Sequence, residues 1–161
     1  MTFEPYDAAD YIDFPSLLDW CTQAAKAHPE WVRLDEVGTS RQGWPILRMV
    51  LGAASLNTKT TPAVWIDAAT HASEWCGVSA ALYSLSKWIQ GLAQGDAELR
   101  TWFSSHLVVA LPCISPDGYQ ALFEGQPFLR STLRPPRFGT PRVGFDPCDM
   151  DGDGVVRWMR W

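Results

Sequence analysis

The chain has 161 residues, of which 47% are hydrophobic and 19% are charged, and this composition is typical of a globular domain rather than a disordered chain. Its net charge of −5 argues against a nucleic-acid-binding protein, because such proteins carry a patch of Lys and Arg. No apolar run is long enough to span a membrane, and the acidic first ten residues do not resemble a signal peptide, so we expect a cytoplasmic location.

The N-terminal part of the sequence predicts a helix followed by a β-hairpin. The helix is expected over residues 15–27, with Asp13 as its N-cap and Pro15 in its first turn. Two apolar stretches, residues 32–39 and 46–51, flank the turn-forming sequence S-R-Q-G-W-P, which predicts two antiparallel strands.

The next part alternates between strand and helix. The apolar run at residues 63–69 has the length of a buried strand, and apolar residues spaced by three and four over residues 75–92 lie on one face of a helix. Asp96 can cap a short helix that ends at Phe103, and residues 107–114 predict a second buried strand. The expected fold is therefore α/β, a mixed β-sheet flanked by helices.

Two potential metal ligands, His71 and Glu74, lie between the first of these strands and the long helix. Ligands bind at the carboxyl ends of strands in open α/β sheets, and imidazole nitrogen and carboxylate oxygen are both good zinc ligands. The spacing H-x-x-E is common by chance, however. The alternative is a helix N-terminus at which Glu74 interacts with the helix dipole and His71 ends the strand.

The other histidines and the cysteines carry weaker signals. His28 lies at a helix end without a partner, and His106 lies at the start of a strand, the end opposite to where ligands gather, so neither is expected to bind a metal. The four cysteines are scattered without a C-x-x-C pair and are expected to be buried free thiols.

The sequence from Ser115 onwards is rich in turn-forming residues. S-P-D-G-Y has strong turn chemistry and leaves its strand at the same sheet edge as His71. Residues 124–161 read as a loop-rich segment, with a cluster of Arg130, Arg134, Arg137 and Arg142 that faces either water or an anion.

An acidic loop near the C-terminus forms a second candidate metal site. Asp149, Asp151 and Asp153 form D-x-D-x-D-G, the beginning of a calcium-binding loop. The twelfth position is Arg160, where such a loop has a bidentate Glu, so an Asp/Gly turn that caps itself is the alternative to a calcium site.

Taken in series, these elements resemble the zinc metallocarboxypeptidases of the carboxypeptidase A type. The hairpin is followed by a strand that ends in H-A-S-E-W, like the family's H-A-x-E-W, and then by a long helix and a strand that runs into S-P-D-G-Y, like the family's N-P-D-G-Y. An Arg-bearing segment comes next, and D-P-C-D-M-D-G-D-G is similar to a segment inserted in some bacterial members.

The resemblance implies an activity and roles for particular residues. It implies hydrolysis of the C-terminal peptide bond of peptides, with His71 and Glu74 as two of three zinc ligands. It also implies that Arg134 binds substrate and stabilises the developing oxyanion, with Arg130 as the nearby alternative. Ser73 stands where many members have an Arg that contacts substrate.

The resemblance also implies that parts of the family's machinery lie beyond this sequence. The family's third zinc ligand (a His), its general base (a Glu) and the Asn–Arg pair that holds the substrate's terminal carboxylate have no counterpart within the 161 residues. We therefore expect residues 1–161 to be the N-terminal portion of an incomplete carboxypeptidase domain that needs the remainder of the catalytic domain. The alternatives are a non-catalytic binding protein that keeps the fold and a related zinc-dependent deacylase of N-acyl amino acids.

Overall fold

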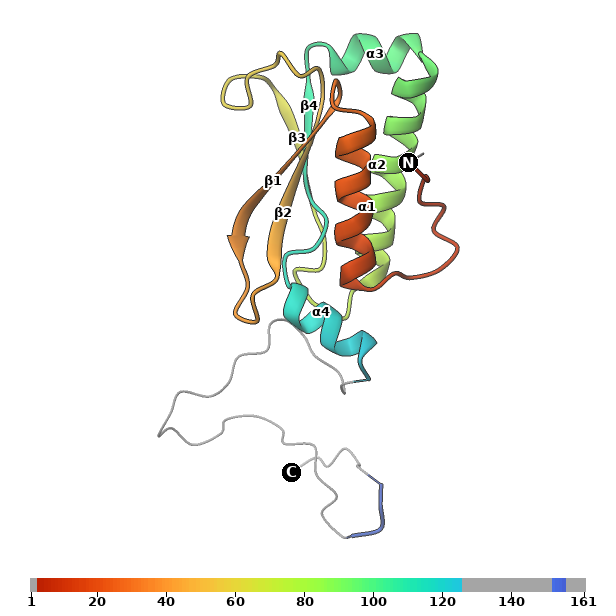
Figure 1. Ribbon diagram of the computed structural model, residues 1–161, viewed down its shortest axis with the longest axis vertical. Coiled ribbons are helices and arrows are strands. Elements are labelled where there is room, and N and C mark those ends of the chain that lie inside the picture. Colours follow the sequence, from red (N-terminus) through yellow and green to blue (C-terminus); the bar gives the residue numbers. More distant parts are fainter. Residues whose placement is uncertain (1–2, 126–151, 156–161) are drawn as a thin grey trace.

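The structure, a computed structural model, describes residues 3–125 and 152–155. Four helices and four strands follow one another in the order α1, β1, β2, β3, α2, α3, β4, α4 (Figure 1). Most of the predicted loop-rich segment, residues 124–161, lies outside the described residues.

Helix α1 (Phe14–Ala27) and the hairpin formed by β1 (Val32–Thr39) and β2 (Pro45–Leu51) confirm the expected N-terminal elements. Asp13 caps α1 by accepting a hydrogen bond from the Ser16 amide at 2.9 Å. The two strands pair antiparallel, with an irregularity between Glu36 and Gly38.

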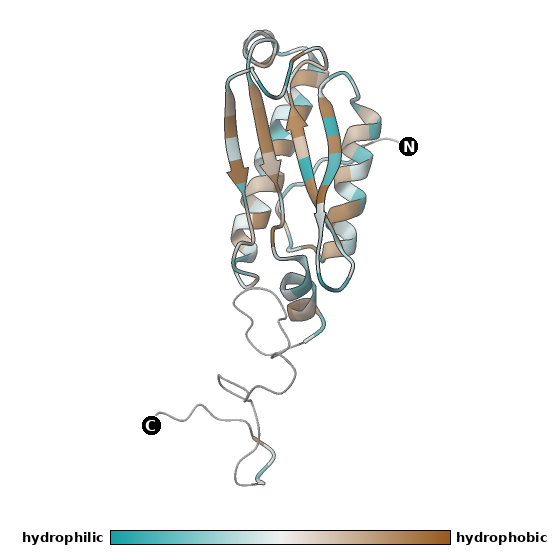
Figure 2. Cartoon of the chain, turned by 90° about the vertical axis from the view of Figure 1, so that its left-hand side faces the viewer, coloured by the Kyte–Doolittle hydropathy of each residue, from teal (hydrophilic) through white to brown (hydrophobic). Residues whose placement is uncertain are grey.

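The sheet is mixed, as expected, and has the order β1-β2-β4-β3. Strand β4 (Leu107–Leu111) pairs antiparallel with β2 and parallel with β3 (Ala63–Asp67). Because β3 and β4 run parallel, their carboxyl ends lie at the same edge of the sheet. Both long helices cover the same face of the sheet, so the strands lie in front of them in Figure 2.

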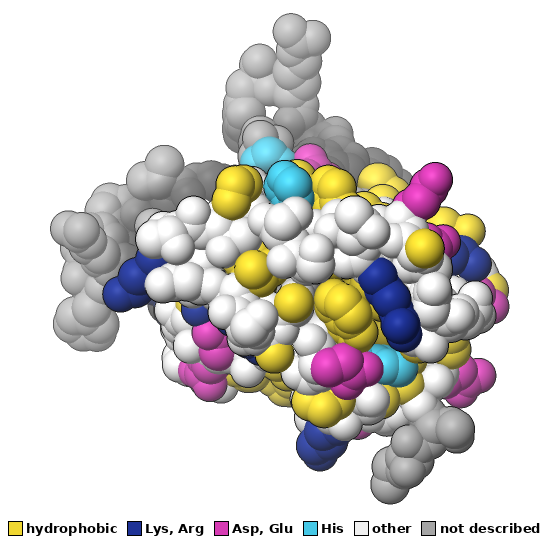
Figure 3. Space-filling view, turned by 90° about the horizontal axis from the view of Figure 1, so that it is seen from above, with side chains coloured by type: hydrophobic (Ala, Val, Ile, Leu, Met, Phe, Trp, Pro, Cys, Tyr) yellow, Lys and Arg dark blue, Asp and Glu magenta, His cyan; other side chains and the backbone are white. Residues whose placement is uncertain are grey.

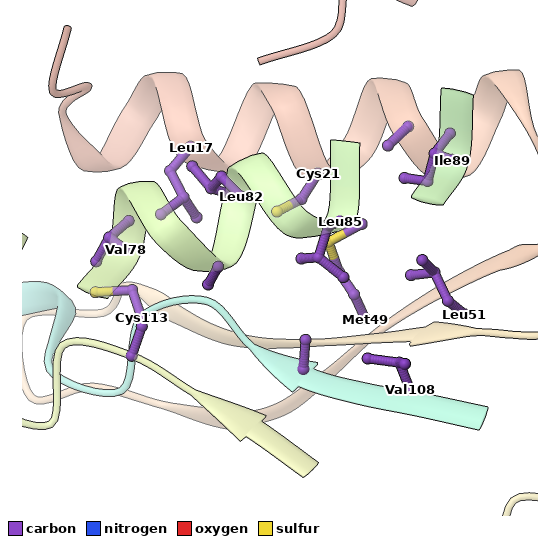
Figure 4. Packing of buried hydrophobic residues seen from close by; sticks show 14 of the residues in the cluster. Leu17, Cys21, Met49, Leu51, Val78, Leu82, Leu85, Ile89, Val108 and Cys113 are labelled. Atoms are coloured by element: carbon purple, nitrogen blue, oxygen red, sulfur yellow. The ribbon is translucent and has the colours of Figure 1, made fainter. Parts of the chain in front are cut away.

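The core lies between this face of the sheet and the helices α1 and α2 (Trp75–Gln94). Helix α2 contributes its apolar stripe, α1 contributes Leu17 and Cys21, and the sheet contributes residues such as Met49 and Val108 (Figure 4). The predicted three-and-four spacing is confirmed, because its members on α2 are buried, namely Val78, Leu82, Leu85, Ile89 and Leu92. Gly95 then ends α2 with a left-handed backbone at φ 87°, which glycine adopts without strain.

Strand β3 is shorter and more exposed than the buried strand predicted over residues 63–69. The exposed fractions of Val64 and Trp65 are 48% and 60%. Within the described residues β3 pairs only with β4, so its outer edge is open. The uninterrupted apolar run that suggested burial is typical of strands covered on both faces, whereas here helices cover one face only.

The sequence S-P-D-G-Y was predicted to form a turn, but in the structure it begins a helix. Helix α4 (Pro116–Phe123) has Ser115 at its N-cap position and Pro116 in its first turn. Pro at this position has a backbone angle suited to a helix and lacks an amide that the helix would leave unpaired. The short helix α3 (Ala97–Phe103) begins at the predicted cap, Asp96, whose carboxylate accepts hydrogen bonds from the Glu98 and Leu99 amides.

The surface of the described part of the chain is mixed in character. No helix in this part has the length and apolar character needed to cross a membrane. At the end of the molecule seen in Figure 3, acidic, basic and hydrophobic side chains are interspersed.

Two of the cysteines are buried, as expected, whereas Cys76 is exposed because it lies on the outer side of the first turn of α2. Burial raises the pKa of Cys113 to about 12 and also raises that of Cys21. The thiolate is the reactive form, so burial lowers the reactivity of Cys21 and Cys113 as well as their access to reagents. We therefore expect iodoacetamide at pH 8 to alkylate Cys76 in the folded chain and to spare Cys21 and Cys113, as peptide mapping by mass spectrometry would detect. Rapid alkylation of Cys21 before unfolding would contradict the packing of α1. Cys148 lies outside the described residues.

Candidate metal centre

The candidate metal centre lies where β3 and β4 leave the sheet. The two chain segments stay together beyond the strands, because the Ala68 amide donates to the Leu111 carbonyl at 3.1 Å. The Ile114 and Ser115 amides then donate to the Ala68 and Ala69 carbonyls at 2.9 and 3.1 Å. The sequence predicted a ligand site at the carboxyl edge of the sheet. The segments that follow β3 and β4 lie together at this edge.

The chain turns sharply between β3 and His71. Ala69 is 2% exposed and has a positive φ of 49°, which is uncommon for a residue with a Cβ atom. Beside it, the Ser115 hydroxyl donates to the Thr70 carbonyl at 3.0 Å. Sequence reasoning missed both features, since an Ala carries no signal for a left-handed backbone and Ser115 was interpreted only as part of a turn.

The side chains of His71 and Glu74 face each other, with Nδ1 of His71 2.8 Å from Oε1 of Glu74. The loop between them is closed by a hydrogen bond of 3.0 Å from the Glu74 amide to the His71 carbonyl. Their side chains are 34% and 58% exposed, so solvent reaches both. Two good zinc-binding atoms thus lie close together at the surface.

The alternative interpretation, a plain helix N-terminus, fits the side chain of Glu74 less well. Glu74 occupies the N-cap position of α2, but its carboxylate makes no capping hydrogen bond. It is directed instead to His71. The following residue, Trp75, packs against α4, with its ring stacked 4.4 Å from that of Phe123.

The remaining histidines lie elsewhere in the fold, as expected. His28 ends α1 and packs edge-on against Phe3. His106 precedes β4, at the end of the sheet opposite to His71, and stacks on Trp102 at 4.9 Å. Within residues 3–125 and 152–155, no three His, Cys, Asp or Glu side chains are grouped so that they could hold a metal ion.

Most of the other predicted site residues lie outside the described residues, namely Arg130, Arg134, Asp149 and Asp151. Asp153 is described and exposed, and its carboxylate accepts a hydrogen bond of 2.9 Å from the Val155 amide. This bond is the one expected for an Asp/Gly turn that caps itself. Calcium binding by this loop stays a prediction.

Comparison with known sequences gives matches to carboxypeptidases. The chain is 28% identical over 135 residues to zinc carboxypeptidase A 1 of Drosophila melanogaster, covering 81% of this chain and 30% of that protein. It is also 28% identical over 126 residues to carboxypeptidase B of Astacus astacus, covering 78% of this chain and 39% of that protein. The chain therefore spans well under half of the length of these relatives.

Solved structures of carboxypeptidases share the fold. Bovine thrombin-activatable fibrinolysis inhibitor, in complex with tick carboxypeptidase inhibitor, matches with a TM-score of 0.68 at 18% identity, covering 87% of this chain and 43% of that chain. Carboxypeptidase A from Helicoverpa armigera matches with a TM-score of 0.68 at 22% identity, covering 78% of this chain and 30% of that chain. The described fold thus corresponds to part of the fold of each of these two structures.

A family model for zinc carboxypeptidases matches residues 17–148, a range that includes both strand exits, His71 and Glu74. This match extends over most of the 161 residues, and it agrees with the relatives and with the fold. The chain belongs to the zinc carboxypeptidase family.

Proposed function

We propose that this chain supplies two zinc ligands, His71 and Glu74, to a metallocarboxypeptidase that hydrolyses the C-terminal peptide bond of peptides. The observation that carries the proposal is the 2.8 Å approach of His71 Nδ1 to Glu74 Oε1 at the carboxyl edge of the sheet, in a chain of this family.

The donor atoms of this pair suit zinc. His71 Nδ1 and Glu74 Oε1 lie 2.8 Å apart, so both atoms could be ligands of one zinc ion after a small movement of the side chains. His71 would bind through its Nδ1 lone pair with its proton on Nε2, and the hydrogen bond to Glu74 would be given up. A zinc ion held by His71 and Glu74 would polarise the scissile carbonyl and lower the pKa of its bound water.

The third ligand and the general base are proposed to come from the remainder of the catalytic domain. The edge of β3 that is unpaired within the described residues supports this proposal, because its free backbone amides and carbonyls could pair with a further strand. Beside this edge lies an apolar cavity of about 180 Å³, lined by Val64, Trp88, Leu99, Trp102, Phe103 and Val108. A further strand paired with β3 would cover the edge, whereas the cavity lies between the sheet and helices α2 and α3.

Substrate binding by Arg134, with Arg130 as the alternative, is proposed from the resemblance alone. A guanidinium at the developing oxyanion is worth about 10²–10³ in rate.

Calcium binding at Asp149, Asp151 and Asp153 is proposed from the sequence motif alone. It is tested by calcium titration followed through Trp158 and Trp161 fluorescence. The cytoplasmic location also stays a prediction.

The proposal is tested by assays of two chains. The 161-residue chain with added zinc is expected to show little or no release of C-terminal residues from peptides, because two ligands bind zinc weakly and the base is missing. The chain extended by the reading frame beyond the Trp161 codon is expected to show zinc-dependent turnover.

Different results would point to the alternatives. Robust turnover by the 161-residue chain would overturn the expectation that it is incomplete. Turnover of N-acyl amino acids in place of peptides by the extended chain would identify a deacylase. A stop codon directly after Trp161, together with no zinc bound at His71, would favour a binding protein.

A further inference from the structure

We infer that Ser115 is a positioning residue for the metal-binding loop: it holds the backbone that carries His71, although it does not touch the metal. The inference rests on the proposed function, since it concerns the loop of the proposed zinc ligands. It is carried by a set of hydrogen bonds between the exits of β3 and β4.

Three consecutive carbonyl groups at the exit of β3 are bound by two residues at the exit of β4. The Ala68 carbonyl accepts from the Ile114 amide, and the Ala69 carbonyl accepts from the Ser115 amide. The Thr70 carbonyl accepts from the Ser115 hydroxyl. The last of these bonds lies directly before His71, so it is the final attachment of the chain before the ligand.

The hydroxyl of Ser115 makes this bond instead of a more usual one. Ser115 is at the N-cap position of α4, where a Ser side chain normally accepts a hydrogen bond from a backbone amide of the first turn. It makes no such bond. Ser115 is 3% exposed, and its buried hydroxyl is satisfied by the hydrogen bond that it donates to the Thr70 carbonyl.

The attached segment contains the unfavourable backbone conformation of Ala69. A residue with a Cβ atom in the left-handed region persists only where its surroundings fix it. Here the carbonyls of Ala68, Ala69 and Thr70 are all held, so the turn that directs the chain to His71 is fixed on both sides of Ala69. Loss of the Thr70 bond would let the loop relax and move His71 relative to Glu74.

The test compares three variants of the 161-residue chain. Ser115→Ala removes the hydroxyl, and Ser115→Thr keeps it. Ser84→Ala is the matched control, because the Ser84 hydroxyl also donates to a carbonyl, that of Ala80 at 2.8 Å, but on the exposed side of α2 and away from the loop. Zinc affinity is measured by calorimetry, and backbone exchange of the metal-free chain is measured by amide hydrogen exchange.

We expect Ser115→Ala to weaken zinc binding about tenfold, as is typical for residues that hold a ligand in place. We also expect it to speed exchange of the Glu74 amide about three- to tenfold, the effect of one lost hydrogen bond. Ser115→Thr should restore both properties, and Ser84→Ala should change neither.

The two measurements separate failure of the inference from failure of the proposed function. If the unaltered chain binds no zinc, the proposed function fails, and the exchange of the Glu74 amide still decides the role of Ser115. An unchanged exchange rate in Ser115→Ala would overturn the inference, and so would a zinc affinity within twofold of the unaltered chain. Faster exchange throughout the core would assign Ser115 to general stability and would overturn it as well.

Discussion

Replacing His71 by alanine is expected to lower the zinc affinity of the chain about 100-fold. Structural zinc sites bind with about 10–16 kcal/mol shared by four ligands, so one ligand is worth about 3 kcal/mol, or about 100-fold in the dissociation constant. By the same reasoning, two ligands give a dissociation constant between about 1 µM and 1 mM. Calorimetric titration with zinc measures both quantities.

Two further variants complete this experiment. Glu74→Gln keeps the shape of the side chain, removes the carboxylate that faces His71, and should also weaken binding strongly. His106→Ala is the matched control, because His106 stacks on Trp102 at the other end of the sheet and should leave zinc affinity unchanged. If His106→Ala weakened zinc binding as much as His71→Ala, the metal site would be misplaced.

Replacing Leu85 by alanine is expected to lower the free energy of unfolding by about 2–5 kcal/mol. Leu85 is fully buried on α2 and lies between this helix and the sheet, near Met49 (Figure 4). Truncation removes apolar surface from the core and leaves a cavity that tightly packed neighbours only partly fill. Because small domains are stable by about 5–15 kcal/mol, this loss is a large share of the total. Urea denaturation followed by circular dichroism measures it.

Tyr83→Ala on the same helix is the control for Leu85→Ala. Tyr83 is exposed, and its ring contacts Lys87, with Nζ 5.1 Å from the ring centroid. Its loss is expected to cost less than about 1 kcal/mol. Equal losses for the two variants would show that the apolar stripe of α2 does not pack against the sheet as described.

Most of the fold could be predicted because its elements carry local signals. The apolar spacing of α2 and the caps Asp13 and Asp96 each depend on residues close in sequence, and the structure has all of them. The exposure of β3 could not be predicted, since it depends on which strands and helices cover that strand. The prediction of a turn at Ser115–Gly118 was wrong, because Ser-Pro-Asp-Gly is favourable both in turns and at helix N-termini, and here it begins α4.

The candidate site could be predicted in part, because its two proposed ligands also lie close together in the sequence. The order of strand, H-x-x-E and helix placed His71 and Glu74 at a sheet edge, and the structure brings their side chains together there. The contribution of Ser115 depends on a contact between residues 45 positions apart, which no local pattern reveals.

Zinc titration of the 161-residue chain, followed by the NMR signals of its three histidine rings, tests the account most directly. We predict that the ring nitrogens of His71 shift on adding zinc, with Nδ1 as the bound atom, and that those of His28 and His106 keep their positions. A shift of His28 or His106 at lower zinc concentrations than His71, or the absence of any shift of His71 at millimolar zinc, would contradict the account.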